Sequence, residues 1–428
     1  MIQSGIVSYT DNYYISNGWR TIAKGVIIPV ILSLITFYGC FVGSLSIGFL
    51  STLATMTYLC ICGFSSLLPT MLYLSLFAYM YNAGGLALYG FICFVYIARC
   101  SFRSRKIGYI ALWFVLYSVT HLISSALTFG NVAPILNIFT LLIASLNYKQ
   151  IDYRNCVLMF VLGVMITSLL GFLKPLSDNL MELLSVDFEE GLTKDAVVRF
   201  SGLSFDPNFY TITTIISLML LIFSGRDKSW FSPVVIVVIM FFGFFSFSKS
   251  YIVLLLVLMI LSILANQNHK LWKLLVLVLL VSLFMATTFD EIIYVFTERF
   301  SGISDMDDLT TGRDSLWQEH LKFISESSLS CWLIGQELPP GMYAAHNTYI
   351  ELLFRFGIIG TIVDFAFVRR CFKQLNRRWQ SWVNLGFIGI MFFSLFNLSA
   401  YTFPTLWACL FMVFILISHR SGVTCLSK

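Results

Sequence analysis

The fold is decided by residues 25–98, which read GVIIPVILSLITFYGCFVGSLSIGFLSTLATMTYLCICGFSSLLPTMLYLSLFAYMYNAGGLALYGFICFVYIA and contain no Asp, Glu, Lys or Arg. About 20 consecutive apolar residues suffice to cross the hydrocarbon core of a bilayer as one helix. This stretch is therefore long enough to cross it more than once. Later runs, such as residues 252–265 and 274–285, are apolar on nearly every face, which is typical of membrane helices.

The composition of the whole chain also favours a membrane protein. The 428 residues are 58% hydrophobic and only 11% charged, whereas soluble domains carry about 25% charged residues. A polar segment precedes the first apolar run and no small-residue cleavage site follows it, so we expect the first helix to stay as a signal anchor. The ten scattered cysteines are expected to pack as small apolar residues. The net charge of +5 says little by itself, and no nucleic acid is expected as a partner.

Acidic and basic residues occupy different segments of the chain. Of the 22 acidic residues, seven lie within 174–206 and ten within 290–337. The basic residues cluster elsewhere, at 99–106, 149–154, 226–228, 270–273 and 369–378. Short cytoplasmic loops are rich in Lys and Arg. We therefore place the basic clusters inside, and two acidic loops, residues 174–207 and 289–345, outside.

Alternation between these anchors predicts membrane spans over most of the chain. The spans are 107–128, 132–147, 155–173, 208–224, 230–247, 250–266, 271–288, 346–368, 382–398 and 403–419. The first apolar stretch holds an even number of further spans, and the choice between two and four gives about 12 to 14 in total. We expect an all-α polytopic protein in which residues 1–428 form a single transmembrane domain. Lys249 is a lone basic residue in an outward turn.

Each external loop leads to a helix start. In the first loop, Arg199 precedes the sequence Asp206-Pro207-Asn208. Asp is a favoured N-cap and Pro suits the first helical position, so a helix should begin here. In the second loop, Thr311 is expected to cap an amphipathic helix that follows Arg313 and lies on the membrane surface. That helix would present Leu316, Trp317, His320, Leu321 and Ile324 on one side.

A third helix starts at His346-Asn347 and runs inward through Glu351 and Arg355. Three helix N-termini, each with a partial positive charge, would thus open to the outer face. Arg199 and Arg313 would add fork-shaped donors that suit phosphate oxygens, so a pyrophosphate fits such a place. The alternative is structural, because exposed arginines in acidic loops are usually weakly paired surface residues.

A carboxylate cluster, Asp305, Asp307 and Asp308, has the D-x-D spacing that can bind a divalent cation. However, nucleotide sugars, the usual reason for that motif, are cytoplasmic, and this loop is expected to face outward. We therefore expect neither a metal ion nor a cofactor.

These residues resemble the O-antigen polymerase and O-antigen ligase superfamily of bacterial polysaccharide assembly. Its signature is His, then Asn, Ser or Gln, then nine residues and Gly-x-x-Gly, and it is met by His346-Asn347 and Gly357-Ile358-Ile359-Gly360. The segment Thr311–Trp317 and the sequence Arg199-x-x-Gly202 are similar to the family as well. One departure is Glu337, which stands where many relatives have a second glycine.

The resemblance implies a GT-C-like helical fold and metal-independent, inverting glycosyl transfer from an undecaprenyl-diphosphate donor. The protein would lie in the bacterial cytoplasmic (inner) membrane with its active site facing outward. Arg199 and Arg313 would hold the donor pyrophosphate, and His346 would position or deprotonate the acceptor hydroxyl. The residues expected to bind substrate are Asn347, Asn208, Glu351 and Arg355. A chain-length regulator and a flippase are the implied partners.

Gly357 and Gly360 are expected to play a structural role. A continuous helix would place Gly357 roughly 16 Å deeper than His346, too deep to touch the sugar. Both glycines are therefore expected to allow close helix packing in the bilayer. Glu351 either orients His346 or pairs with Arg355, and the sequence leaves both interpretations open.

Three functions compete. A polymerase would move a growing glycan onto the next lipid-linked repeat unit, and we favour it because the Thr-Gly-Arg and Asp-Pro-Asn contexts look more like polymerases. A ligase would transfer the finished glycan to a lipid A core. A lipid-linked oligosaccharide flippase is less favoured, because transporters usually keep charges near the midplane and here the notable residues gather in external loops.

Overall fold

The structure is a computed structural model that describes residues 25–83, 86–103, 152–184, 200–204, 206–223, 231–246, 248–265, 313–337, 345–373, 381–395 and 404–423, with a few single positions between them. The expected spans 107–128, 132–147 and 271–288 lie wholly or mostly outside these ranges. The same holds for Arg199 and for the cluster Asp305–Asp308.

The first apolar stretch folds into four helices. They are Gly25–Phe41, α2 (Leu45–Ile61), α3 (Phe64–Ser75) and α4 (Tyr89–Arg103). The short helix η1 (Ala78–Tyr81) and an antiparallel hairpin of β1 (Asn82–Ala83) and β2 (Leu86–Ala87) connect α3 to α4. The break before α2 has a local cause, since the Ser44 side chain accepts a hydrogen bond from the Ile47 N–H and so caps the new helix. The sequence left open whether this stretch forms two or four helices, and the structure shows four.

The rest of the described chain is helical too. Its helices are α7 (Tyr153–Gly171), η3 (Lys174–Leu176), α8 (Asp178–Leu184), α9 (Pro207–Phe223), α10 (Phe231–Phe244), α11 (Lys249–Ala265), α15 (Arg313–Glu326), α16 (Leu329–Ile334), α17 (Thr348–Lys373), α18 (Trp382–Leu395) and α19 (Pro404–Val423). Every expected span that falls on described residues coincides with one of these helices. The prediction of an all-helical protein is confirmed for this part of the chain, apart from the two-residue strands.

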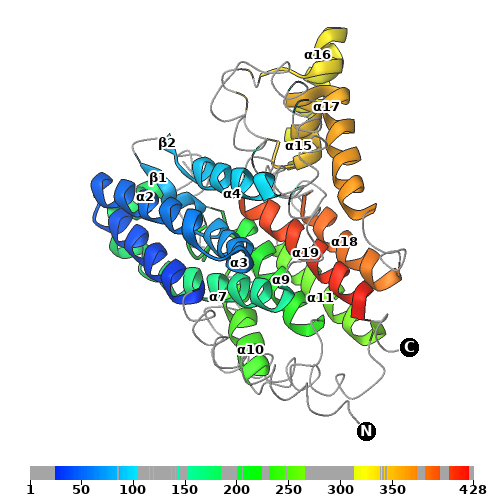
Figure 1. Ribbon diagram of the computed structural model, residues 1–428. Coiled ribbons are helices and arrows are strands. Elements are labelled where there is room, and N and C mark those ends of the chain that lie inside the picture. Colours follow the sequence, from blue (N-terminus) through cyan, green and yellow to red (C-terminus); the bar gives the residue numbers. More distant parts are fainter. Residues whose placement is uncertain are drawn as a thin grey trace, which may run out of the picture.

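The core of the bundle is built around α9. Most of its side chains are buried, including the polar Thr211, Thr214 and Ser217. It packs against α7, α10, α11 and α19. In Figure 1, α9 and α19 run through the middle of the bundle, whereas α15, α16 and α17 project from one end. Thr211 and Thr214 donate to carbonyls of the preceding turn, whereas the Ser217 hydroxyl has no hydrogen-bond partner among the described residues.

The outer surface of the bundle is apolar. Large hydrophobic side chains such as Phe49, Leu53 and Ile362 are more than half exposed. Exposed apolar surface of this extent is consistent with a membrane-inserted protein. By length and composition, α7 is the one described helix that can cross a bilayer unaided, and eight further apolar helices are shorter, with 10–17 residues.

Contacts at one end of the bundle join helix ends that carry basic residues. The Tyr153 ring stacks on His419 with 3.9 Å between centroids. The Arg420 guanidinium lies 5.5 Å from the ring centroids of both Phe223 and Phe387. The ends of α7, α9, α18 and α19 therefore meet here, as the charge alternation predicts for one side of a membrane.

Contacts at the opposite end join the other set of helix ends. The Ser177 hydroxyl donates to the Phe41 carbonyl over 2.6 Å, and Thr405 donates to the Ser75 carbonyl over 3.1 Å. The Phe200 N–H donates to the Phe245 carbonyl over 3.0 Å. These are the ends that the charge pattern assigns to the acidic, outward side.

Candidate functional site

A hydrogen bond brings two of the sequence motifs together. The indole Nε1–H of Trp317, one turn into the helix that begins at Arg313, donates to the Ala345 carbonyl over 2.8 Å. Ala345 directly precedes His346. The start of α15 and the start of α17 therefore lie side by side, although the bonded residues are 28 positions apart in the sequence.

The packing of α15 on α17 extends this contact along both helices. His320 is 1% exposed, and its ring lies edge-on to Phe354 with 5.5 Å between centroids. Phe323 stacks on the same ring at 5.7 Å. On the predicted apolar side of α15, His320 and Ile324 are buried, whereas Leu321 is 48% exposed. The apolar face of α15 covers α17, and Thr311 lies outside the described residues.

His346 has an unusual backbone. Its φ is 47°, and no other non-glycine residue in the described ranges has a positive φ. A left-handed conformation at such a residue costs about 1–3 kcal/mol and persists only where its surroundings impose it. Residues of this kind cluster at active sites and ligand clamps. The strained position coincides with the histidine of the predicted motif.

Asn347 forms the N-cap of α17. Its side-chain oxygen accepts hydrogen bonds from the N–H groups of Tyr349 at 3.0 Å and Ile350 at 3.3 Å, and the residue is 2% exposed. Its carbonyl accepts from the Glu351 N–H. The prediction that Asn347 contacts substrate thus has a structural alternative, because its amide oxygen already caps the helix.

Glu351 and Arg355 form an ion pair one turn apart on α17. The distance from Arg355 Nε to Glu351 Oε1 is 3.1 Å, and the carboxylate is the more buried partner. Of the two interpretations left open for Glu351, the structure therefore shows pairing with Arg355. This pair lies on the same helical limb as His346.

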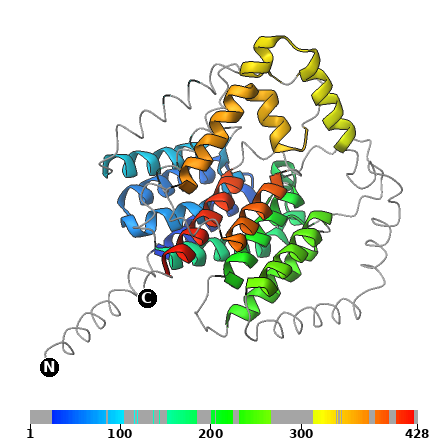
Figure 2. The same cartoon turned by 90° about the vertical axis from the view of Figure 1, so that its right-hand side faces the viewer.

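The α17 helix is not continuous. At Gly357 the backbone leaves the helical region, with φ 60° and ψ −168°. Figure 2 shows the two orange limbs of α17 meeting at a sharp angle. The expectation of a helix that continues straight through Gly357 and Gly360 is therefore wrong, because the chain turns at Gly357, whereas residues 348–356 before it are helical as expected.

The two signature glycines pack against other partners than expected. A Cβ on Gly357 would lie 2.5 Å from the Leu333 carbonyl, so its close neighbour is the end of α16 in the external loop. A Cβ on Gly360 would overlap the Phe356 side chain of α17 itself. The expectation that these glycines serve helix–helix packing in the bilayer is thus replaced by a role in the kink.

The end of the first external loop starts α9 as predicted. The Asp206 Oδ1 accepts a hydrogen bond from the Asn208 N–H, and Pro207 is the first helical residue. The Asn208 side-chain oxygen accepts a hydrogen bond from the Ser248 hydroxyl over 3.0 Å. Asn208 is 7% exposed and links the start of α9 to the turn before α11. Asn208 therefore contacts residues near the end of the first external loop, and this contact is separate from those between α15 and α17.

The segment that follows Arg199 is firmly anchored, although Arg199 itself lies outside the described residues. The Phe200 ring lies tilted against Phe172 with 4.9 Å between centroids and makes an edge contact with Tyr210 at 5.4 Å. Gly202 has φ 56°, and a Cβ on Gly171 would lie 2.5 Å from its Cα. Only glycines allow this backbone approach between α7 and the loop.

Lys174 is a polar residue near this loop that the sequence did not single out. Its ammonium lies 3.3 Å from the Leu184 carbonyl and 3.4 Å from the Ser201 hydroxyl. Burial lowers the pKa of the Lys174 ammonium. Its place at the start of an acidic loop, directly after a predicted span, was the one available signal. The contact with the Leu184 carbonyl gives Lys174 a structural role, because a cation at the C-terminal end of α8 complements the helix dipole.

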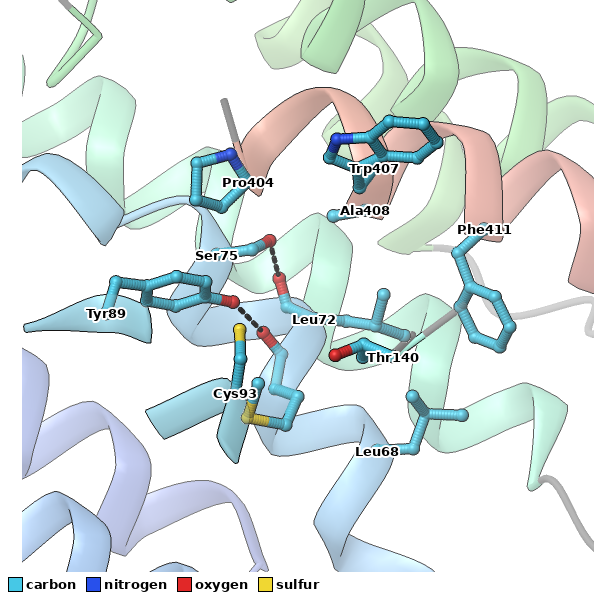
Figure 3. Close-up of a pocket in the computed structure, with 11 residues that line it drawn as sticks. Leu68, Leu72, Ser75, Tyr89, Cys93, Thr140, Pro404, Trp407, Ala408 and Phe411 are labelled. Carbon is cyan, nitrogen blue, oxygen red and sulfur yellow. Dashed lines mark hydrogen bonds between the residues drawn. The ribbon is translucent and has the colours of Figure 1, made fainter. Parts of the chain in front are cut away.

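Outside these contacts, the described residues form no cluster of metal ligands and line a small cavity. Within the described ranges no three His, Cys, Asp or Glu residues converge as metal ligands. A cavity of about 30 Å³ lies between α3, α4 and α19, where Tyr89 donates to the Met71 carbonyl (Figure 3). Its lining is mainly apolar, with Leu68, Trp407 and Phe411. It has room for about one water molecule and none for a glycan.

Comparison with known proteins finds a family model that matches part of the chain, including α15 and the first limb of α17. Residues 212–364 match the family model described as O-antigen ligase. The resemblance to the O-antigen polymerase and ligase superfamily is thereby confirmed. The matched segment contains Arg313 and His346 and both signature glycines, whereas Arg199 and Asn208 precede it. No curated protein and no solved structure matches the chain. The superfamily comprises bacterial membrane enzymes of glycosyl transfer that act on lipid-linked polysaccharide.

Proposed function

We propose that the protein is a polysaccharide polymerase that transfers glycan from an undecaprenyl-diphosphate donor onto another lipid-linked repeat unit at the outer face of the cytoplasmic membrane. The observation that carries the proposal is the Trp317–Ala345 hydrogen bond, which joins the start of the Arg313 helix to the strained His346. A cationic residue and a candidate base are thus held on neighbouring helix starts.

In the proposed reaction the protein accepts a proton from the acceptor and stabilises the charge of the leaving group. His346 takes the proton of the acceptor hydroxyl as its oxygen attacks the anomeric carbon of the donor sugar. The bond from that carbon to the diphosphate oxygen breaks, and the electron pair leaves with the diphosphate. Arg313, together with Arg199 from the first loop, stabilises the negative charge on the leaving group. Attack from the face opposite the diphosphate inverts the anomeric centre, and no metal ion takes part.

The charge pattern supports a site at the outer face of the membrane. The basic ends of α7 and α19 meet on one side, and the acidic loops leave from the other. With the expected spans that lie outside the described residues included, we propose 12 to 14 membrane helices in a GT-C-like arrangement. A chain-length regulator and a flippase would act beside the polymerase.

A ligase is the second candidate, and the description of the matched family model favours it. The two functions share the donor and differ in the acceptor, which is a lipid-linked repeat unit for the polymerase and a lipid A core for the ligase. A flippase has less support, because the matched family is one of glycosyl-transfer enzymes.

The test is transfer by the purified protein in nanodiscs, with synthetic undecaprenyl-diphosphate repeat units and EDTA. Wild type is expected to form a ladder of polymers, and Arg313→Ala and His346→Ala are expected to form none. Lys322→Ala, which removes an exposed charge from the same helix, is the matched control and should keep the ladder. Transfer only after addition of a lipid A core would establish a ligase. An EDTA-sensitive ladder would contradict the metal-free mechanism.

A further inference from the structure

Two glycines with the same unusual backbone meet where α16 reaches α17. Gly335 ends α16 with φ 83° and ψ −177°, and Gly357 breaks α17 with φ 60° and ψ −168°. This backbone region is populated essentially only by glycine. A Cβ on Gly335 would overlap the Arg355 carbonyl, and one on Gly357 would lie 2.6 Å from the Gly335 nitrogen. Neither position has room for a side chain.

Gln336 secures the contact between these glycines. In a continuous helix the Phe354 carbonyl would accept from the N–H four residues later, beyond the kink. Here the Gln336 N–H donates to this oxygen over 2.9 Å. The Gln336 side-chain amide donates to the Ser327 hydroxyl, just after α15, over 3.0 Å. One residue therefore ties α15 and α16 to the kinked helix.

We propose that Gly335, Gln336 and Gly357 form a joint that positions the transferase site. The joint fixes α15 and α16 on the first limb of α17 and so sets Arg313 relative to His346. This inference rests on the proposed function, in which those two side chains act together. The three residues act through others and touch neither donor nor acceptor.

A small change of angle at the joint displaces the far end of α15, where Arg313 stands. The joint holds the end of α15 near Ser327, and Arg313 stands at the opposite end of that helix of 14 residues. Such a helix is about 20 Å long, so a tilt of about 3° moves its far end by about 1 Å. A misplacement of about 1 Å can cost a catalytic site about 100-fold in rate. The Trp317–Ala345 bond is the second fixed point, close to Arg313.

The first experiment compares Gly357→Ala and Gln336→Ala with Gly389→Ala. Gly389, in α18, is the matched control, because a Cβ there would meet no atom within 4 Å. In the nanodisc assay, kcat should fall about 100-fold for Gly357→Ala and less for Gln336→Ala, with KM for the donor unchanged. Gln336→Ala keeps its backbone hydrogen bond and should unfold at the wild-type temperature. Wild-type kcat in both joint variants would overturn the proposal.

The second experiment measures position without activity. Spin labels on cysteines at Gln318 in α15 and Ala366 in the second limb of α17, both exposed, report the angle across the joint. Pulsed EPR should give one narrow distance distribution for wild type and Gly389→Ala, and a broad or shifted one for both joint variants. An unchanged distribution in these variants would refute the joint. If wild type transfers no glycan, the proposed function fails, whereas the EPR comparison still decides whether the joint exists.

Discussion

At the scale of single residues, His346 is the position where backbone and proposed chemistry coincide. Asn tolerates a positive φ well and has no basic ring nitrogen. We expect His346→Asn to fold with the wild-type unfolding temperature and to lose polymer formation by about 10²–10⁴-fold, the usual contribution of a general base. Rates measured on the purified variant in nanodiscs check this. A wild-type rate would show that His346 takes no proton in the reaction.

Asn347 offers a test of helix capping against substrate binding. Ser caps helices about as well as Asn, whereas Ala costs about 1 kcal/mol. Because the Asn347 oxygen accepts from the Tyr349 and Ile350 N–H groups, we expect Asn347→Ser to keep both stability and transfer. Asn347→Ala should lose stability, measured by thermal unfolding. If the Ser variant is stable but transfers no glycan, Asn347 binds substrate as the sequence predicted.

At the scale of elements, two aspartates cap helices at opposite ends of the bundle. Asp206 accepts from the Asn208 N–H at the start of α9, and Asp152 accepts from the Asn155 N–H at 3.2 Å at the start of α7. Replacing either by Ala should cost about 1 kcal/mol of stability. Only Asp206→Ala should also slow transfer, because it loosens the Asn208–Ser248 contact beside the first loop. Equal slowing by both variants would show that the first loop has no special role.

The elements also show where pattern reasoning fails. Start signals such as Asp206-Pro207 are local, and the structure confirms the helix they predict. The kink at Gly357 has no comparable signal, because glycines in membrane helices usually serve packing. Its cause is the approach of Leu333 and Gly335 from a loop more than 20 residues earlier. Long-range contact, rather than local propensity, breaks this helix.

At the scale of the whole molecule, the membrane orientation can be measured directly. Cysteines at Asn179 and Gln318 should react with a membrane-impermeant thiol reagent applied to intact spheroplasts, because both side chains are exposed at the proposed outer end. A cysteine at Ser381, exposed at the basic end, should react only after lysis. The opposite pattern would invert the topology and place the proposed chemistry in the cytoplasm.

Composition, charge-free length and the distribution of basic residues suffice to predict a helical membrane protein and most helix positions, because bilayer insertion depends on local hydrophobicity and charge. The spaced His and glycine motif likewise suffices to indicate the family. Its geometry depends on contacts between distant segments. The Trp317–Ala345 bond, the left-handed His346 and the fit of Gly335 against Gly357 arise only when α15 and α16 fold back on α17. No local pattern encodes such contacts, because close backbone packing depends on which surfaces meet in three dimensions.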